Sequence, residues 1–193
     1  MKKLLITGFD PFGSNTVNAS WLAVEQLPKQ LGQFILRKRM LPTVFGEAAQ
    51  IVIEEAKVWK PDVVLCIGLA AGRNAVTPER IGVNIRDARI PDNAGNWSTG
   101  ERIIPAGPAA YFSTVPVEKM VQAIRDAEIP ATVSNSAGTF VCNDVLYSLL
   151  HHFSNATTRI GFIHVPPLPE QSETGMPLNK IVTALSVAIL ACG

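Results

Sequence analysis

Charged side chains are scarce in this sequence: Asp, Glu, Lys and Arg make up 17% of its 193 residues, against about 25% in an ordinary soluble domain. The formal net charge is +1, and the basic residues do not cluster. Nucleic acid and anionic membranes are therefore excluded as expected partners, since both require a basic surface. A surface with so few charges also leads us to expect that part of it is buried between subunits.

Cysteine is also rare, and long apolar runs are missing. The three cysteines, Cys66, Cys142 and Cys192, are odd in number and far apart, so they indicate neither a disulfide framework nor a metal site. The basic N-terminus precedes too short an apolar run for a signal peptide, and the longest largely apolar segment, 181–192, is too short to span a bilayer. We expect a soluble, cytoplasmic protein.

Short apolar runs alternate with amphipathic segments along the whole chain. Strands are predicted at 3–7, 34–40, 63–67, 81–85, 130–133 and 159–165. Helices are predicted at 18–27, 45–59, 116–127, 141–150 and 177–190. This order predicts an α/β fold, and without repeats or linkers we expect one domain, 1–193. Ligand sites in such folds lie beyond the carboxyl ends of the strands, so the loops there are expected to converge on one crevice.

Cys142 stands where a small-residue loop, SNSAG at 134–138, runs into the helix predicted at 141–150. The unpaired backbone N–H groups and the dipole at a helix N-terminus favour a thiolate, which makes Cys142 a candidate nucleophile with a lowered pKa. The alternative is a structural role. Cys142 lies within the apolar stripe of that helix, and free cysteines are usually buried.

A thiolate nucleophile needs a base, and the base needs a group that orients it. His151 and His152 lie near the end of the predicted helix, where a positive charge is favourable without a catalytic role. His164 is the better candidate because it lies at the end of a buried strand, although a structural histidine would occupy the same place. Spacing leaves three acids open as its partner: Asp10, Glu79 and Asp92.

Two loops are unusual. The loop at 8–13 carries two exposed phenylalanines, Phe9 and Phe12, which are either anchors for the loop or pocket walls. The segment 87–107 has no periodicity, and a loop of that length is usually functional or disordered. Four arginines in the middle of the chain are candidates for oxyanion stabilisation, or are simply surface charges: Arg73, Arg80, Arg86 and Arg89.

Six sequence blocks go beyond what composition explains. In chain order they are TGFDPFG at 7–13, TPERIGVN at 77–84, ARIPDNAG at 88–95, GPAAYFST at 107–114, AGTFVCN at 137–143 and GFIHVP at 161–166. In these blocks, and along almost its whole length, the chain resembles pyroglutamyl peptidase I, also called pyrrolidone-carboxylate peptidase, a family of cysteine exopeptidases.

The resemblance implies an enzyme that removes an N-terminal 5-oxoproline from peptides and needs no metal or coenzyme. The family's catalytic cysteine, histidine and glutamate fall on Cys142, His164 and Glu79. Its arginine near the oxyanion hole falls on Arg89. Its lactam pocket, carried over by position, would use Phe9, Phe12, Asn18, Leu69, Phe140 and Val141.

The resemblance also implies a three-layer α/β/α sandwich around a mostly parallel, twisted sheet, and a homotetramer in the cytoplasm. There are departures from the family pattern. GLAAGR at 68–73 has Ala71 in place of a glycine and Leu69 where glutamine is common, NAS at 18–20 replaces NPS, and Trp97 lies in an altered stretch after Gly95. Two alternatives therefore stay open: a related thiol hydrolase with a shifted substrate, and a non-catalytic module that binds pyroglutamyl peptide ends.

Overall fold

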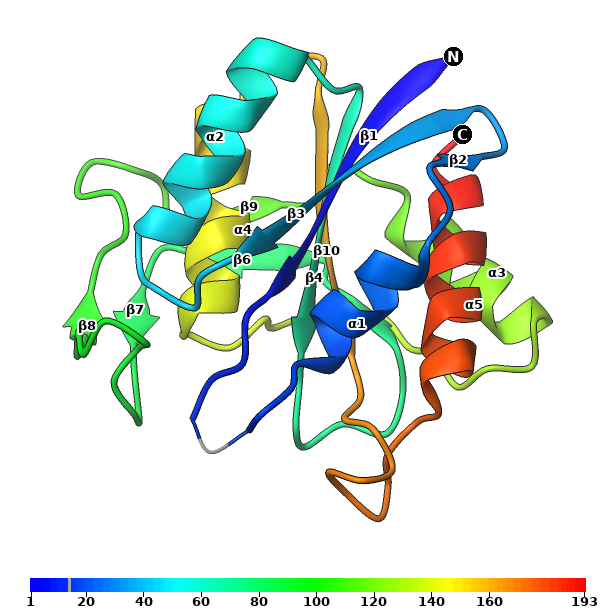
Figure 1. Cartoon of the computed structure of the whole chain (residues 1–193). Helices are drawn as coiled ribbons and strands as arrows, with labels where there is room; N and C mark the ends of the chain where they lie inside the picture. Colours follow the sequence, from blue (N-terminus) through cyan, green and yellow to red (C-terminus); the bar gives the residue numbers. More distant parts are fainter. Residues whose placement is uncertain (14) are drawn as a thin grey trace.

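A six-stranded sheet forms the centre of the computed structural model, which describes residues 1–13 and 15–193 (Figure 1). Its strand order is β2-β3-β1-β4-β10-β5. The four long strands, β1 (Lys2–Phe9), β3 (Phe34–Leu41), β4 (Val63–Leu69) and β10 (Arg159–Val165), are mutually parallel. The two-residue strands β2 (Gln30–Leu31) and β5 (Thr77–Pro78) pair antiparallel at the edges. The sheet is thus mostly parallel, as predicted.

Helices cover both faces of this sheet, which confirms the three-layer α/β/α arrangement. Figure 1 shows α1 (Ala19–Gln26), α3 (Val117–Asp126) and α5 (Leu178–Leu190) on one face, and α2 (Glu47–Trp59) and α4 (Val141–His152) on the other. Each face has its own apolar core. Successive strand residues supply the two cores in turn, so that β4 is buried on both sides and is apolar along almost its whole length.

The first strand is longer than predicted, and this changes the status of one phenylalanine. Phe9 ends β1 and is only 2% exposed, so the prediction of two exposed phenylalanines is wrong for this residue. Gly8 also lies in the strand. A Cβ at Gly8 would lie 2.7 Å from the Cα of Trp21, so the glycine allows α1 to pack close to β1.

Two further predictions are corrected around the middle of the chain. The strand predicted at 81–85 is the shorter β6 (Ile81–Val83), which pairs with β9 (Ala110–Phe112) outside the central sheet. The segment 130–133 forms no strand and makes a single bridge, from Ala131 to Val76. Pro130 lacks an N–H donor, which limits ladder formation there.

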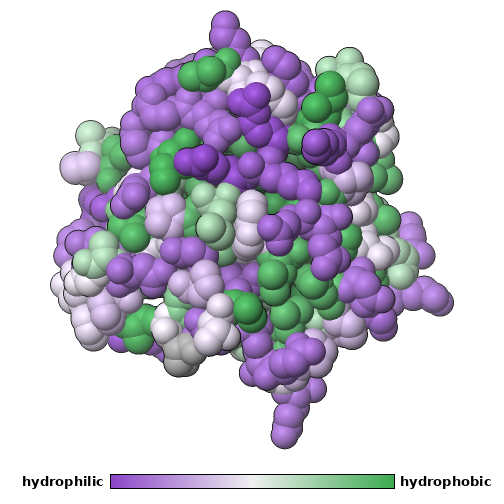
Figure 2. All heavy atoms as spheres, in the orientation of Figure 1, coloured by the Kyte–Doolittle hydropathy of each residue, from purple (hydrophilic) through white to green (hydrophobic). Residues whose placement is uncertain are grey.

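The long segment 87–107, which has no periodicity in the sequence, contains a short antiparallel pair of strands, β7 (Arg86–Asp87) and β8 (Thr99–Glu101). Figure 2 shows hydrophobic side chains interspersed with polar ones over the face seen in Figure 1. Large hydrophobic residues that stay exposed include Ile35 and Met40 on β3. In the described part of the chain, no helix combines the length and the apolar character that crossing a membrane requires.

Candidate active site

Cys142 is the second residue of α4 and is half-buried, whereas Cys66 and Cys192 are fully buried. The loop before the helix turns at Gly138, whose φ is +75° and therefore suits glycine. Phe140 at the N-cap is extended and makes no side-chain hydrogen bond to the helix. The first N–H groups of α4 therefore remain available beside the thiol.

The thiol of Cys142 lies over the end of β4. A Cβ built at Gly68 would lie 2.9 Å from Cys142 Sγ, so only a glycine leaves room for the thiol at this point. In the register of the sheet, Gly68 is the partner of His164 on β10. The pairing of β4 with β10 therefore brings the imidazole and the thiol, which the sequence separates by 22 positions, to the same sheet edge.

Glu79 is the acid that meets His164. His164 Nδ1 lies 2.7 Å from Glu79 Oε1, and the two side chains are almost fully buried. The antiparallel pairing of β5 with β10 places the acid there, since Thr77 pairs with His164 and the Glu79 N–H donates to Phe162 O at 2.8 Å. The carboxylate holds the proton on Nδ1 and leaves Nε2 as the acceptor.

The other two candidate acids have different partners. Asp10 Oδ1 accepts hydrogen bonds from the backbone N–H and hydroxyl of Thr43, at 2.8 and 2.7 Å, and from Asn93. Asp92 accepts hydrogen bonds from the side-chain amide of Asn96 and from the backbone N–H groups of Phe45, Asn96 and Ala94, and these lower its pKa despite desolvation. Both aspartates hold loops together, which leaves Glu79 as the acidic partner of His164.

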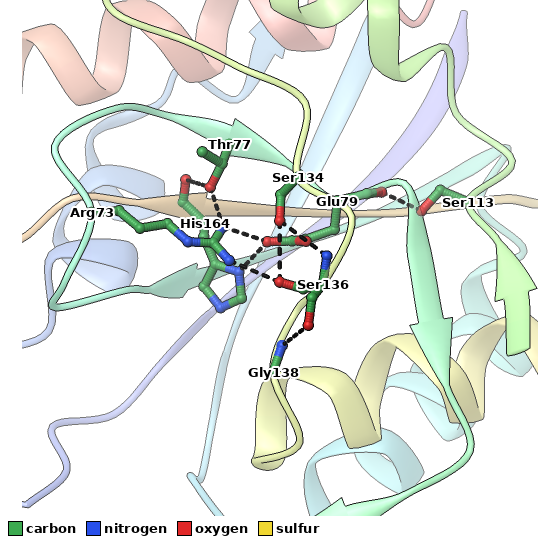
Figure 3. Close-up of polar contacts among 8 residues, drawn as sticks. All are labelled: Arg73, Thr77, Glu79, Ser113, Ser134, Ser136, Gly138 and His164. Carbon is green, nitrogen blue, oxygen red and sulfur yellow. Dashed lines mark hydrogen bonds and ion pairs between the residues drawn. The ribbon is translucent and has the colours of Figure 1, made fainter.

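Arg73 completes the group around Glu79, as Figure 3 shows. Its Nη1 donates to Glu79 Oε1 at 2.6 Å and to the hydroxyl of Thr77, and its Nη2 donates to Ser136 O at 2.8 Å. Desolvation by itself would raise the pKa of Glu79, but the hydrogen bond and charge of His164, together with Ser134 and Arg73, hold it below the ordinary value. Glu79 is therefore ionised at neutral pH.

The pocket above the thiol has a volume of about 190 Å³, below the roughly 300–1,000 Å³ of pockets for drug-sized ligands, and so it suits a small ring. Its lining consists of Phe9, Phe12, Asn18, Thr43, Leu69, Ala137, Phe140, Cys142 and His164. Phe12 and Phe140 pack with ring centroids 6.3 Å apart, and Phe45 packs edge-on against Phe140 at 5.3 Å. The predicted crevice at the strand ends is thus present.

Five of the six residues expected in the lactam pocket line this cavity; Val141 does not. Val141 is fully buried in the core beneath α4. Thr43 and Ala137 line the pocket but were not predicted. Thr43 follows the polar strand β3, and Ala137 is one small residue among several, so neither carried a sequence signal.

Arg89 is exposed and lies outside the pocket lining, and its role in oxyanion stabilisation stays a prediction. The other three candidate arginines have partners in the structure. Arg86 pairs with the buried Asp144 at 2.6 Å, and Arg80 pairs with Glu118 at 3.1 Å. The contact of Arg73 with Glu79 was missed because spacing does not show which arginine reaches a buried acid.

The predicted lowering of the thiol pKa is wrong for the free protein. Burial in the apolar pocket raises the pKa of Cys142 to about 12, and the negative charge of Glu79 and the neighbouring Cys66 act in the same direction. Arg73 and a backbone hydrogen bond lower it, but less. The sequence showed the helix N-terminus but not the depth of the pocket. The resting thiol is therefore neutral, and it needs a base at the moment of reaction.

The remaining histidines have structural surroundings. Tyr111 Oη lies 2.9 Å from His151 Nδ1, and His152 packs edge-on against Phe153. Within residues 1–13 and 15–193, no cluster of three or more His, Cys, Asp or Glu side chains has an arrangement that could hold a metal ion.

A three-layer α/β/α fold that brings a thiol and an imidazole to one small apolar pocket, with a buried carboxylate bound to the imidazole, is typical of the class of the cysteine hydrolases. Comparison with known proteins narrows this class. The family model described as pyroglutamyl peptidase matches residues 2–193. The chain belongs to the pyroglutamyl peptidase family.

Individual relatives agree with this assignment. A pyrrolidone-carboxylate peptidase of Escherichia fergusonii is 48% identical over 98% of this chain and 92% of its own length. A pyrrolidone-carboxylate peptidase of Bacillus licheniformis is 47% identical over 97% of this chain and 90% of its own length. Pyroglutamyl peptidase I of Bacillus amyloliquefaciens superposes with a TM-score of 0.95 at 42% identity, covering 100% of this chain and 97% of the other. Pyrrolidone carboxyl peptidase of Thermococcus litoralis also gives 0.95, at 36% identity and 100% and 93% coverage.

Proposed function

We propose that this protein is a cysteine exopeptidase, an omega peptidase, that hydrolyses the bond after an N-terminal 5-oxoproline of peptides through an acyl-enzyme. Membership in the pyroglutamyl peptidase family supports the class of reaction. The observation that carries the proposal is the pocket itself, in which Cys142 and His164 face one small, largely apolar cavity. All 193 residues would act as a single catalytic domain.

In the proposed mechanism, His164 acts as the base and Glu79 holds it in place. Nε2 of His164 accepts the thiol proton while Sγ of Cys142 attacks the 5-oxoproline carbonyl, which forms a C–S bond and an oxyanion. The tetrahedral intermediate expels the amine, which takes the proton from His164. Water then attacks the thioester while His164 accepts one of its protons. The C–S bond breaks, free 5-oxoproline is released, and the thiolate takes the proton back from His164 to give the neutral thiol.

The raised pKa of Cys142 fits this order of events. A thiol that is neutral in the empty pocket loses its proton to His164 only when the carbonyl is in place. The oxyanion would be held by backbone N–H groups at the start of α4, assisted by Arg89. Removal of one such donor typically lowers kcat about 10²–10³-fold.

The lining of the pocket explains a preference for the neutral lactam. An N-terminal glutamate would bring an ammonium and a carboxylate against Phe9, Phe12 and Phe140, where neither charge has a partner, and burial of unpaired charges is costly. We expect pyroglutamyl peptides to be hydrolysed and the matching glutamyl peptides to be left intact. Equal rates for the two peptides would contradict this pocket model.

The decisive assay is the release of a chromogenic amine from a pyroglutamyl amide. The intact protein should release it, and Cys142→Ser should lose at least about 10³-fold in kcat. Cys66→Ser is the matched control, since Cys66 is fully buried in β4 and lies outside the pocket lining. A Cys142→Ser protein that keeps near-normal turnover would exclude the mechanism. Binding of pyroglutamyl peptides without turnover would instead support a binding module.

We also propose that the protein acts in the cytoplasm as a homotetramer. The support is a low content of charged residues, 17%, and exposed apolar side chains such as Ile35, Met40 and Phe112. Light scattering coupled to size-exclusion chromatography should give four times the mass of the chain. A monomer at micromolar concentration would contradict it.

A further inference from the structure

Arg73 has a position that the proposed three-residue mechanism does not explain. It lies in the turn that follows β4, and no part of it lines the pocket above Cys142. Its guanidinium instead contacts two other parts of the site at once (Figure 3). One hydrogen bond goes to the carboxylate of Glu79 and another to the loop that leads into α4.

The contact with Glu79 concerns charge. Glu79 is 0% exposed, and a buried carboxylate is costly unless a charged partner and hydrogen bonds compensate for the lost water. His164 contributes a hydrogen bond to the carboxylate, and Arg73 adds a guanidinium, which is always positively charged, at 2.6 Å. Both donors meet at Oε1, and Oε2 has no hydrogen-bond partner among the described residues. Removal of Arg73 would therefore leave the carboxylate with the imidazole of His164 and the hydroxyl of Ser134, and without a permanent positive charge beside it.

The contact with Ser136 concerns geometry. Nη2 donates to Ser136 O at 2.8 Å, and Ser136 Oγ accepts the N–H of Gly138 at 3.2 Å. Ser134 adds two hydrogen bonds to Ser136 within the same turn. Four residues after Gly138, the chain reaches Cys142. The planar fork of Arg73 thus ties the acid that orients the base to the loop that orients the nucleophile.

We propose that Arg73 is a positioning residue of the reaction, which keeps Glu79 ionised and fixes the Glu79–His164 pair relative to the Cys142 loop. This inference rests on the proposed function. The charged and titratable groups that face Glu79 are Arg73 from the turn after β4, His164 from β10 and Cys142 from α4, and Ser134 adds a hydroxyl. Arg73 is the permanent charge among them.

Two substitutions separate the charge from the geometry. Arg73→Gln removes the positive charge, which makes protonation of Glu79 easier, so the acidic limb of the kcat/KM profile should move to higher pH. Its kcat should fall about 10–100-fold, as for other residues that orient a reactive group, while KM stays within about twofold. Arg73→Lys keeps the positive charge but not the two nitrogen donors that reach Glu79 and Ser136 together. Its acidic limb should stay near that of the unmodified protein although its kcat falls.

Arg80→Gln is the matched control. Arg80 holds the same loop through Asn135 Oδ1 at 2.7 Å and pairs with the exposed Glu118, but makes no contact with Glu79. It should keep the kcat and the pH profile of the unmodified protein. Thermal unfolding of all variants shows whether each is folded. If Arg73→Gln matches Arg80→Gln in kcat and in the acidic limb, or loses kcat only in step with its Tm, the proposal is wrong.

A second measurement does not depend on the substrate. Arg73 lowers the pKa of the Cys142 thiol, so its removal should reduce the thiolate fraction and slow alkylation by iodoacetamide at a given pH. Slower alkylation in Arg73→Gln than in Arg80→Gln would support the proposal even if pyroglutamyl amides are not hydrolysed. Equal alkylation rates in the two variants would contradict it. Failure of the proposed function is thereby distinguished from failure of the role of Arg73.

Discussion

Gly68 makes room for the thiol of Cys142, because any side chain at position 68 would begin 2.9 Å from Sγ. Contacts that short force atoms to move. The same Cβ would also lie 2.9 Å from the ring of Phe162, so a side chain at position 68 would be too close to two neighbours at once. The position of the nucleophile is thus determined by the absence of a side chain on the neighbouring strand.

Gly68→Ala should therefore reduce activity more than its size suggests. A displacement of about 1 Å can lower kcat about 10²-fold, and overpacking of a tight core typically costs about 1–3 kcal/mol of stability. Steady-state kinetics and urea unfolding would measure the two effects. Gly72→Ala is the control, since nothing lies within 4 Å of a Cβ there. Equal activity of the two variants would mean that the thiol is not confined as described.

The buried carboxylate of Glu79 should make the stability of the folded protein decrease at acidic pH. The pKa of Glu79 is lowered from its ordinary value of 4.5, and such a group stabilises the folded state above the unfolded pKa. The stabilisation is lost as the pH falls from about 4.5 through the folded pKa. In Glu79→Gln, the free energy of unfolding should therefore depend less steeply on pH below this value.

Urea unfolding at several acidic pH values would test this prediction, with the exposed Glu170→Gln as the control. Glu79→Gln should also lose about 10²–10⁴-fold in kcat, because the amide no longer stabilises the imidazolium or enforces its tautomer. An acid dependence identical to that of Glu170→Gln would contradict the ionised state of Glu79.

Alkylation of the free protein should follow the raised pKa of Cys142. The thiol is protonated at neutral pH, so the rate with iodoacetamide should keep rising above pH 9, the ordinary value for a thiol. Mass spectrometry would locate the label on Cys142 alone while the protein is native, since Cys66 and Cys192 are both 0% exposed. A rate that is already constant at pH 7 would show a thiolate in the resting site.

Asp92 should affect substrate binding through the aromatic side chains of Phe45 and of Phe140, which lines the pocket. Its Oδ2 accepts the N–H of Phe45 at 2.9 Å, and the ring of Phe45 packs edge-on against Phe140. Hydrogen bonds to a charged group each contribute about 1.5–3 kcal/mol, so Asp92→Ala should lower Tm and raise KM more than it lowers kcat. The exposed Asp126→Ala serves as the control. A normal KM in a folded Asp92→Ala protein would show that the positions of Phe45 and Phe140 do not depend on Asp92.

Much of the fold could be predicted from local patterns. The strand predicted at 63–67 is a continuous apolar run, and the helix predicted at 45–59 has a clear 3.6-residue period. The structure confirms both with small shifts of their ends, to Val63–Leu69 and Glu47–Trp59. The segment 130–133 was wrongly predicted as a strand because four apolar or β-branched residues carry the same pattern whether or not a partner strand is present. Pairing is a long-range property, and local sequence does not contain it.

The site was predictable where residue type and position coincide. Cys142 at a helix start and His164 at a strand end were candidates from chemistry alone, but the choice of Glu79 over Asp10 and Asp92 needed the resemblance or the three-dimensional structure. The pKa of the thiol could not be predicted, since it depends on how many apolar side chains from distant segments surround it. Arg73 was missed for the same reason.

The most direct test of the central claim is the capture of the acyl-enzyme. The protein would be mixed with a pyroglutamyl ester, quenched with acid within the first turnover, digested and examined by mass spectrometry. We predict one pyroglutamyl acyl group, located on the peptide that contains Cys142, and none in Cys142→Ser. Rapid product release without any label on Cys142, or a label on another residue, would contradict the account.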